Sequence, residues 1–223
     1  MWPRTKTATA MAFRDQRRRP LVLILLVLLP AYVITKSIAQ TEATPRRIEL
    51  PGDVWITTTM KNLHGPEMGK LSVAFAAALV GVFVMQSALQ GDRRLVAVAL
   101  LVMAVFIGPA SWPALVVALV LIGLIYAALG ALAGALLGRL AATYVMLFLV
   151  MTDLGVVQSA MFHAAPVRFA WLLPGYAPTR VMLDGTFANS FHAGFDLLLA
   201  CGWLTTLAAA VYLVFRRAVG AGT

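Results

Sequence analysis

Residues 113–138 read PALVVALVLIGLIYAALGALAGALLG, an apolar run without a single charged side chain. A helix of about 20 such residues crosses the hydrocarbon core of a bilayer, so this run predicts a membrane-spanning helix. Five further apolar segments lie at 20–39, 69–90, 95–110, 140–161 and 194–215. The sequence therefore predicts an all-α integral membrane protein with six transmembrane helices in a single domain, 1–223.

The overall composition excludes a soluble globular domain. Hydrophobic residues make up 61% of the chain and charged residues only 12%, and the mean hydropathy is +0.87. A soluble domain carries about 25% charged residues, which its surface needs for solvation. The single cysteine, Cys201, allows no intrachain disulfide.

The positive charges predict the orientation of the spans. The net charge is +9, and the basic residues cluster at the edges of apolar segments without the interleaved aromatics of a nucleic-acid surface. With both termini in the cytoplasm, the short basic clusters all lie inside, as the positive-inside rule requires. These residues are Arg4, Lys6, Arg14, Arg17, Arg18, Arg19, Arg93, Arg94, Arg139, Arg216 and Arg217. We therefore expect an N-in, C-in protein of the cell membrane and no nucleic-acid partner.

This orientation places two long loops, 40–70 and 162–193, on the outer side. The second loop is semi-apolar, and we expect short helices at the outer membrane face to bury it before the last span. The N-terminus has a competing interpretation, because its basic region, apolar core and Ser37-Ile38-Ala39 resemble a cleavable signal peptide. Cleavage would leave the other five spans oriented as before.

No catalytic or nucleotide-binding motif stands out along the chain. The nearest approach to a phosphate-binding loop, Gly65-Pro66-Glu67-Met68-Gly69-Lys70, is one spacer residue short and is followed by Leu71 rather than Ser or Thr. Metalloprotease and serine-hydrolase signatures are also missing from the sequence. We expect a chain that is not itself an enzyme and that binds no cofactor.

Polar residues in or beside the last two spans are the candidates for a translocation path or gate. Asp153, with Gln158 nearby, lies well inside the predicted fifth span, where an ionisable group must face other helices or water. A carboxylate satisfied by neighbouring helices is an equally good interpretation. Asp184 lies in the second loop, and His192 and Asp196 lie one helical turn apart at the start of the last span. For this pair a hydrogen-bonded cap is favoured over a metal site, which needs three or more converging ligands.

Three glycines recur every four residues along the fourth span, at Gly130, Gly134 and Gly138. Small residues on one face let a second helix approach closely. The spacing indicates a helix-packing surface, either between subunits or, as we favour, within the chain.

The order of these segments resembles the permease subunits of ATP-binding-cassette exporters of the second integral-membrane class. The resemblance begins with RDQRRRP at 14–20, which leads into a first span containing Pro30. It is strongest from Gly123 to Arg217, where a Gly-rich span, another span, a semi-apolar segment and a terminal span follow in the family's order. Within the semi-apolar segment, LLPGYAPTRVMLDG at 172–185 is similar to the family's short helix after a proline.

The resemblance implies a homo- or heterodimer of six-span subunits in the lipid bilayer, driven by separate cytoplasmic ATPases that bind ATP and magnesium. The basic segment 1–19 would form an amphipathic helix on the inner leaflet. The candidate contacts to the ATPase are Arg17, Arg18, Arg19, Asp92, Arg93 and Arg94. One departure affects coupling, because residues 90–94 replace a helix of a dozen or more residues that usually docks on the ATPase.

Two other kinds of protein remain open from the sequence. One is a proton-coupled secondary transporter that uses Asp153, although no internal repeat supports it. The other is a non-transporting membrane subunit with a role in assembly or regulation.

Overall fold

The computed structural model describes residues 39–83 and 110–220. The predicted amphipathic segment 1–19, nearly all of the predicted spans 20–39 and 95–110, and the connection at 90–94 lie outside these residues. The described elements are the strands β1 (Pro45–Leu50) and β2 (Val54–Thr59), the helices α3 (Met60–Phe83), α5 (Trp112–Leu137), α6 (Arg139–Val150), α7 (Tyr176–Phe187) and α8 (Gly194–Gly220), and the short helical turns η1 (Pro51–Asp53), η2 (Met151–Val157) and η3 (Ala170–Leu172).

Within the described part of the chain, three helices are long and apolar enough to cross a membrane, at Trp112–Leu137, Leu140–Val157 and Gly194–Val214. They correspond to the spans predicted at 113–138, 140–161 and 194–215. The fold is mostly helical, but these three helices are fewer than the six that the sequence predicts. Helix α3 begins at Met60, well before the span predicted at 69–90, because the loop in front of it is itself structured.

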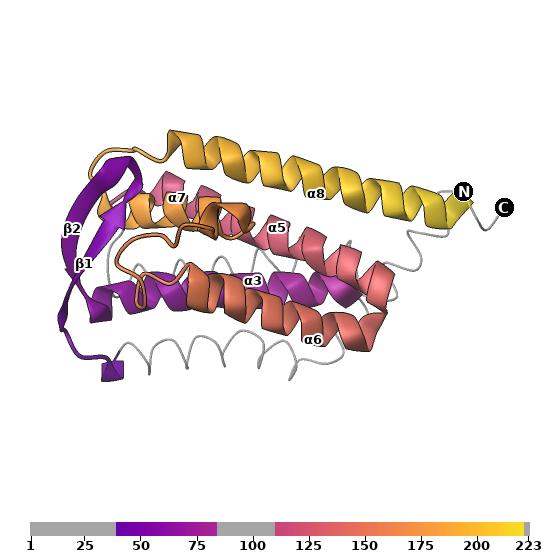
Figure 1. Ribbon diagram of the computed structural model, residues 1–223, viewed down its shortest axis with the longest axis horizontal. Coiled ribbons are helices and arrows are strands. Elements are labelled where there is room, and N and C mark those ends of the chain that lie inside the picture. The colour runs from indigo at the N-terminus through magenta and orange to yellow at the C-terminus, as the bar shows by residue number, and fades with distance from the viewer. Residues whose placement is uncertain (1–38, 84–109, 221–223) are drawn as a thin grey trace.

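Helix α5 is the centre of the bundle. It packs against α3, α6, α7 and α8, which run roughly along the same axis (Figure 1). Its buried side chains include Leu115, Leu119, Ile122 and Ile125, none of which is exposed to solvent. The β-hairpin and α7 close one end of the bundle, and the Gly138 turn and the end of α8 lie at the other end. We call these the hairpin end and the Gly138 end.

The hairpin corrects the all-α prediction for the loop at 40–70. Strands β1 and β2 pair in antiparallel register, with Ile48 opposite Ile56. The β-branched residues of β2 favour a strand, and β1 buries Ile48 and Leu50 against the helices. Gly52 takes a φ of 75° in the connecting turn, a conformation that glycine adopts without strain. An isolated hairpin is marginal in water, so its packing on the bundle stabilises it.

The fifth predicted span also differs from expectation, because it ends at Val157 rather than at 161. Helix α6 passes into the π-helix η2, and the Gln158 amide donates to the Asp153 carbonyl oxygen at 2.8 Å. Gln158 then leaves helical geometry, at φ −95° and ψ 10°. Short π-helical segments are rare and often occur at functional sites. Asp153 lies in this π-helix and is one of the buried polar residues of the bundle.

Candidate functional site

A first group of buried polar residues lies inside the bundle towards the hairpin end. This bundle cluster consists of Glu67 and Lys70 from α3, Tyr126 from α5, Asp153 from η2, and Gln158, which follows η2. All five side chains are more than nine-tenths buried. Since buried polar groups are costly without partners, their hydrogen bonds decide what the cluster does.

Asp153 joins three parts of the chain through one oxygen. The Tyr126 hydroxyl donates to Asp153 Oδ2 at 2.5 Å, and the Gly175 amide donates to the same oxygen at 3.0 Å. A Cβ at Gly175 would lie within 3 Å of side-chain atoms of Leu154, Tyr126 and Asp153, so a larger residue there would displace the groups around the carboxylate. Asp153 Oδ1 has no hydrogen-bond partner among the described residues. The carboxylate therefore holds α5, the π-helix and the start of α7 together.

Lys70 connects α3 to the residues that follow the π-helix. Its ammonium group is fully buried and lies 2.9 Å from Glu67 Oε2, and it donates to the Gln158 carbonyl oxygen at 2.8 Å. The Ala160 amide donates to Glu67 Oε1 at 3.2 Å. The side-chain amide of Gln158 in turn donates, through Nε2, to the Ala170 carbonyl oxygen at 3.2 Å. A buried ion pair of this kind needs such extra hydrogen bonds to offset the loss of water.

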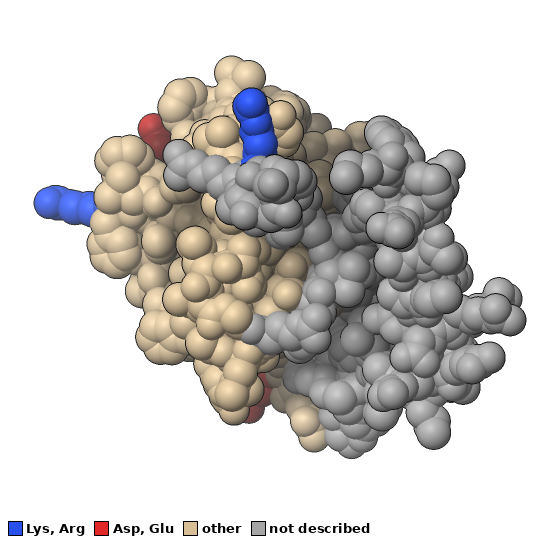
Figure 2. Space-filling model, turned by 90° about the vertical axis from the view of Figure 1, so that its right-hand side faces the viewer, with Lys and Arg blue, Asp and Glu red and all other residues tan. Residues whose placement is uncertain are grey.

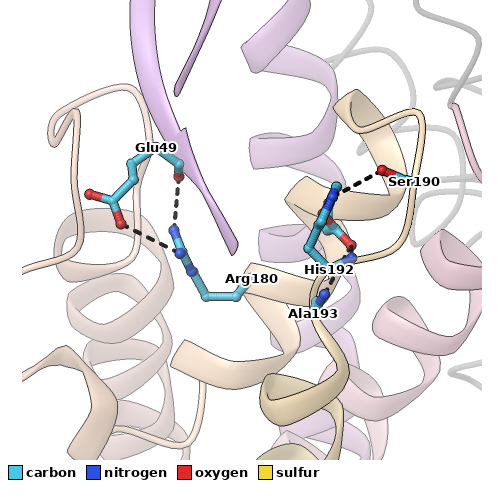
Figure 3. Close-up of polar contacts among 6 residues, drawn as sticks. Glu49, Arg180, Ser190, His192 and Ala193 are labelled. Carbon is cyan, nitrogen blue, oxygen red and sulfur yellow. Dashed lines mark hydrogen bonds and ion pairs between the residues drawn. The ribbon is translucent and has the colours of Figure 1, made fainter. Parts of the chain in front are cut away.

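A second group of polar residues, the cap cluster, lies where the hairpin meets α7 and the start of α8. It consists of Glu49, Arg180, Asp184, His192 and Asp196. Arg180 donates to the Glu49 carbonyl oxygen at 2.8 Å, and its other terminal nitrogen lies 3.5 Å from Glu49 Oε1 (Figure 3). These contacts fix the hairpin to α7. Burial raises the pKa of nearby Tyr176 above its usual value, and the Arg180 charge opposes that rise.

Asp184 reaches from α7 to the start of α8. Its Oδ2 accepts hydrogen bonds from the amides of His192 and Ala193, at 2.8 and 3.2 Å. The His192 ring pairs with Asp184, at 3.4 Å between Nδ1 and Oδ1, and its Nε2 lies 2.9 Å from the Ser190 hydroxyl. Asp184 therefore caps the first turn of α8 from another helix. The sequence places His192 beside Asp196, whereas the His192 ring lies against Asp184, and Asp196 is buried one turn further along.

A small pocket of about 30 Å³ lies beside the cap cluster. It is lined by Ile48 and Glu49 of β1, the segment after η2, and Thr179, Arg180 and Leu183 of α7. Both Thr179 Oγ1 and Arg180 Nε are buried there without a hydrogen-bond partner. The pocket holds only a few water-sized groups. Across residues 39–83 and 110–220, no three His, Cys, Asp or Glu side chains converge as a metal site would require.

The candidate packing glycines fall into two kinds. A Cβ at Gly130 would overlap the Ala78 carbonyl oxygen, and a Cβ at Gly134 would lie 2.9 Å from the Val82 carbonyl oxygen. These two glycines therefore allow α3 and α5 to pack backbone to backbone within the chain. Gly138 has no neighbour within 4 Å of such an atom and instead forms the turn between α5 and α6, at a φ of 75°.

The candidate ATPase contacts Arg17, Arg18, Arg19, Asp92, Arg93 and Arg94 lie outside the described residues. Several buried residues of the two clusters were not singled out from the sequence, among them Glu67, Lys70, Tyr126 and Arg180. Glu67 and Lys70 carry a readable signal, since opposite charges three residues apart face each other on a helix. Tyr126 gives no such signal, because only the fold brings it to Asp153.

Comparison with known protein families, with curated proteins and with solved structures gives no match.

Proposed function

We propose that this chain is the transmembrane permease subunit of an ATP-binding-cassette exporter in the cell membrane, driven by a separate cytoplasmic ATPase. One observation carries the proposal. The Gly-rich helix α5 is followed by α6, by the short helix α7 and by the long helix α8, in the order that the resemblance from Gly123 to Arg217 implies. Helix α7 occupies the stretch similar to the family's short helix, and nearly all of its residues are buried.

The exposed surface of the helices supports insertion in a bilayer. Helices α6 and α8 expose large apolar side chains along much of their length, including Leu140, Tyr144 and Phe148 on α6 and Leu198 and Tyr212 on α8. Charged side chains are few among the described residues at the Gly138 end (Figure 2). Contiguous apolar surface of this kind is rare on soluble monomers. In the proposal, the segments at 20–39, 69–90 and 95–110 complete the six spans.

The two clusters would close the path at its outer end. In the N-in, C-in orientation the hairpin end faces outward, and Asp153, Gln158, Asp184, His192 and Asp196 all lie towards that end. Their contacts join helices to one another and to the hairpin, so outward release of a substrate would require some of them to separate. The Arg180–Glu49 contact is one of the contacts that join the hairpin to α7 and would have to separate.

In the proposal, ATP hydrolysis by the separate ATPase would supply the energy for transport at the Gly138 end of the bundle. ATP and magnesium would bind to the partner ATPase, and Arg17, Arg18, Arg19, Asp92, Arg93 and Arg94 are the proposed contacts to it. A second permease subunit, identical or not, would complete the pathway.

Purification from the native membrane tests the proposal. The tagged chain should bring down an ATP-binding-cassette ATPase, and the reconstituted complex should hydrolyse ATP faster than the ATPase alone. Replacing Arg93 and Arg94 by Lys keeps the topology signal but removes the planar, bidentate guanidinium groups, so coupling should weaken while insertion stays correct. A chain that inserts fully and never associates with an ATPase would exclude the proposal.

The proton-coupled alternative is favoured by one observation, the burial of the ionisable Asp153 side chain inside the bundle. If the chain is an exporter permease, the Asp153→Asn variant should still bind the ATPase, and only the stimulated ATPase activity of the complex should change. A proton-coupled transporter would instead move protons in vesicles without any ATPase and lose that movement in Asp153→Asn. An assembly or regulatory subunit would do neither.

A further inference from the structure

Besides Trp55 on the hairpin itself (43% exposed), six large aromatic side chains are exposed around the hairpin end of the bundle. We call them the aromatic girdle: Trp112 (42% exposed), Phe162 (66%), Phe169 (53%), Trp171 (57%), Phe191 (50%) and Phe195 (77%). Trp112, Phe162, Phe191 and Phe195 lie within five residues of the end of a helix that is long and apolar enough to cross a membrane. Phe169 and Trp171 flank Ala170, whose carbonyl oxygen accepts a hydrogen bond from the Gln158 side chain just after η2. Trp112 begins α5, Phe191 and Phe195 flank the start of α8, and the other three follow the end of η2.

Hydrogen bonds place the girdle residues at the same end of the molecule. The Ser111 amide, next to Trp112, donates to the Gly185 carbonyl oxygen at 2.7 Å. Arg46 of β1 donates to the Phe162 carbonyl oxygen at 3.1 Å. The backbone amide of His192, just before α8, donates to Asp184 Oδ2 at 2.8 Å. The ends of all three helices are thus tied to α7 or to the hairpin, which places the girdle residues beside them at this end.

The segment 167–172 contains two of the girdle residues, Phe169 and Trp171, and its backbone is hydrogen-bonded to the bundle. Ala170 is fully buried, and it accepts a hydrogen bond from the Gln158 side chain. Its neighbours Phe169, Trp171 and Leu172 are each more than half exposed, and Arg168 beside them is exposed too. The segment therefore presents three large apolar side chains and one cation while its own backbone is anchored in the protein.

Lipid is the partner that matches this surface. Tryptophan side chains concentrate at the membrane–water interface, because the indole joins an apolar ring system to a polar N–H group, and neighbouring Phe rings add apolar area to bury in the same layer. An arginine beside them fits the phosphate groups of the same layer. Trp55 on the hairpin is also exposed, at 43%, but the Arg47 guanidinium lies over its ring, 4.9 Å from the ring centroid.

We propose that the segment 167–172 inserts Phe169, Trp171 and Leu172 into the interfacial layer of one phospholipid leaflet, with Arg168 among the phosphates. The proposal rests on the proposed membrane insertion of the chain and adds a defined lipid contact to it. The leaflet surface would then pass through the girdle, leaving the hairpin in water.

Quenching by brominated lipids tests the contact directly. Three variants each retain one tryptophan, Trp171, Trp55 or Trp203, with the others replaced by Phe, in vesicles of phosphatidylcholine and phosphatidylglycerol. Bromine near the headgroup end of the acyl chains should remove most of the Trp171 emission and little of the Trp55 emission. Trp203, in the middle of α8, reports whether the chain is inserted at all.

The outcomes separate this inference from the proposed function. If Trp203 is quenched by deep bromines and Trp171 is quenched only by aqueous iodide, the chain is inserted and the lipid contact is wrong. If neither lipid nor iodide reaches Trp171, a second copy of the chain or another protein covers it, which also overturns the contact. If no tryptophan is quenched by lipid, membrane insertion itself fails.

A spin label gives a second measurement should a single-tryptophan variant fold poorly. Phe169→Cys and Thr57→Cys are each labelled in a Cys201→Ser background. The label at 169 should be reached better by molecular oxygen, which concentrates in lipid, and the label at 57 better by a water-soluble nickel complex. Equal preference for the nickel complex at both positions would overturn the proposal.

Discussion

The Tyr126 hydroxyl donates a hydrogen bond to Asp153 across 2.5 Å, and both residues are buried among apolar helices. Tyr126 lies in the middle of α5, and Asp153 lies in the π-helix that extends α6. Their contact ties the central helix of the bundle to the segment where helical register changes. Because Gly175 donates to the same carboxylate oxygen, the start of α7 is tied to this point as well.

Removing the Tyr126 hydroxyl should destabilise the fold without changing its shape. Tyr126→Phe leaves a buried carboxylate with one donor fewer. Hydrogen bonds between helices in a membrane contribute about 0.6 kcal/mol on average and up to about 1.7 kcal/mol, and bonds to charged groups lie at the upper end. We expect a loss of about 1–2 kcal/mol in the free energy of unfolding, measured in mixed detergent micelles.

Tyr144→Phe is the matched control, because Tyr144 lies on α6 and is 66% exposed. Its unfolding free energy should equal that of the parent chain. Equal loss in both variants would mean that the Tyr126–Asp153 hydrogen bond contributes nothing specific.

The Glu67–Lys70 pair should behave as a unit. Breaking a buried ion pair by removing one partner costs about 3–5 kcal/mol, since the other charge is left buried alone. Lys70→Met should therefore destabilise the chain strongly, and the double variant Glu67→Gln with Lys70→Met should be more stable than Lys70→Met alone. Unfolding of the parent chain and of these two variants in mixed micelles measures the difference. A double variant that is the least stable of the set would show that the pair is not the relevant unit.

Much of the helical framework could be predicted from hydropathy alone. The predicted stretch 113–138 differs from α5 by a single residue at each end, and 194–215 starts where α8 starts. Both helices are long apolar runs. Pro113 lies in the first turn of α5 and Gly138 follows its end, whereas Gly194 begins α8. Hydropathy could not show that the chain leaves helical geometry at Gln158, because residues 158–161 are as compatible with a continued span.

The polar clusters show the limit of the same reasoning. The positive-inside rule places Glu67 and Lys70 in the outer loop at 40–70, yet both are buried where α3 meets the chain after η2. Pairings such as Arg180 with Glu49 join residues far apart in the sequence. Such contacts depend on which helices pack together, and this information is absent from the periodicity of any one segment.

The α3–α5 contact should tolerate no side chain at Gly130. A Cβ there meets the backbone of Ala78, which cannot rotate away as a side chain can. Overpacking of this kind costs about 1–3 kcal/mol, so Gly130→Ala should unfold at lower denaturing-detergent fraction than the parent chain. Gly202→Ala on α8 is the control, with no atom within 4 Å of the added methyl group. If both alanine variants are equally stable, the two helices are not held in close contact.

The topology predicts which ends of the bundle meet opposite sides of the membrane. Helix α5 has 26 residues and is therefore about 39 Å long, longer than the roughly 30 Å hydrocarbon core. Thr57 on the hairpin and Asn189 before α8 are exposed at the hairpin end, and Arg139 begins α6 at the Gly138 end. Cysteines introduced singly at these positions and at Asp92, in a Cys201→Ser chain, report their side through a membrane-impermeant maleimide.

We expect intact cells to label Thr57→Cys and Asn189→Cys, because both lie at the end that the positive-inside rule places outside. Asp92→Cys and Arg139→Cys should react only after the membrane is opened, since the short basic connections stay in the cytoplasm. The fold adds a constraint that the charge rule lacks. Thr57 and Asn189 lie in different loops but at one end of the bundle, so they must share a side whichever way the chain inserts. Labelling of all four from outside would mean that the described helices do not cross the membrane. If only Asp92→Cys and Arg139→Cys are labelled in intact cells, the chain inserts in the opposite orientation. That result is compatible with the same fold.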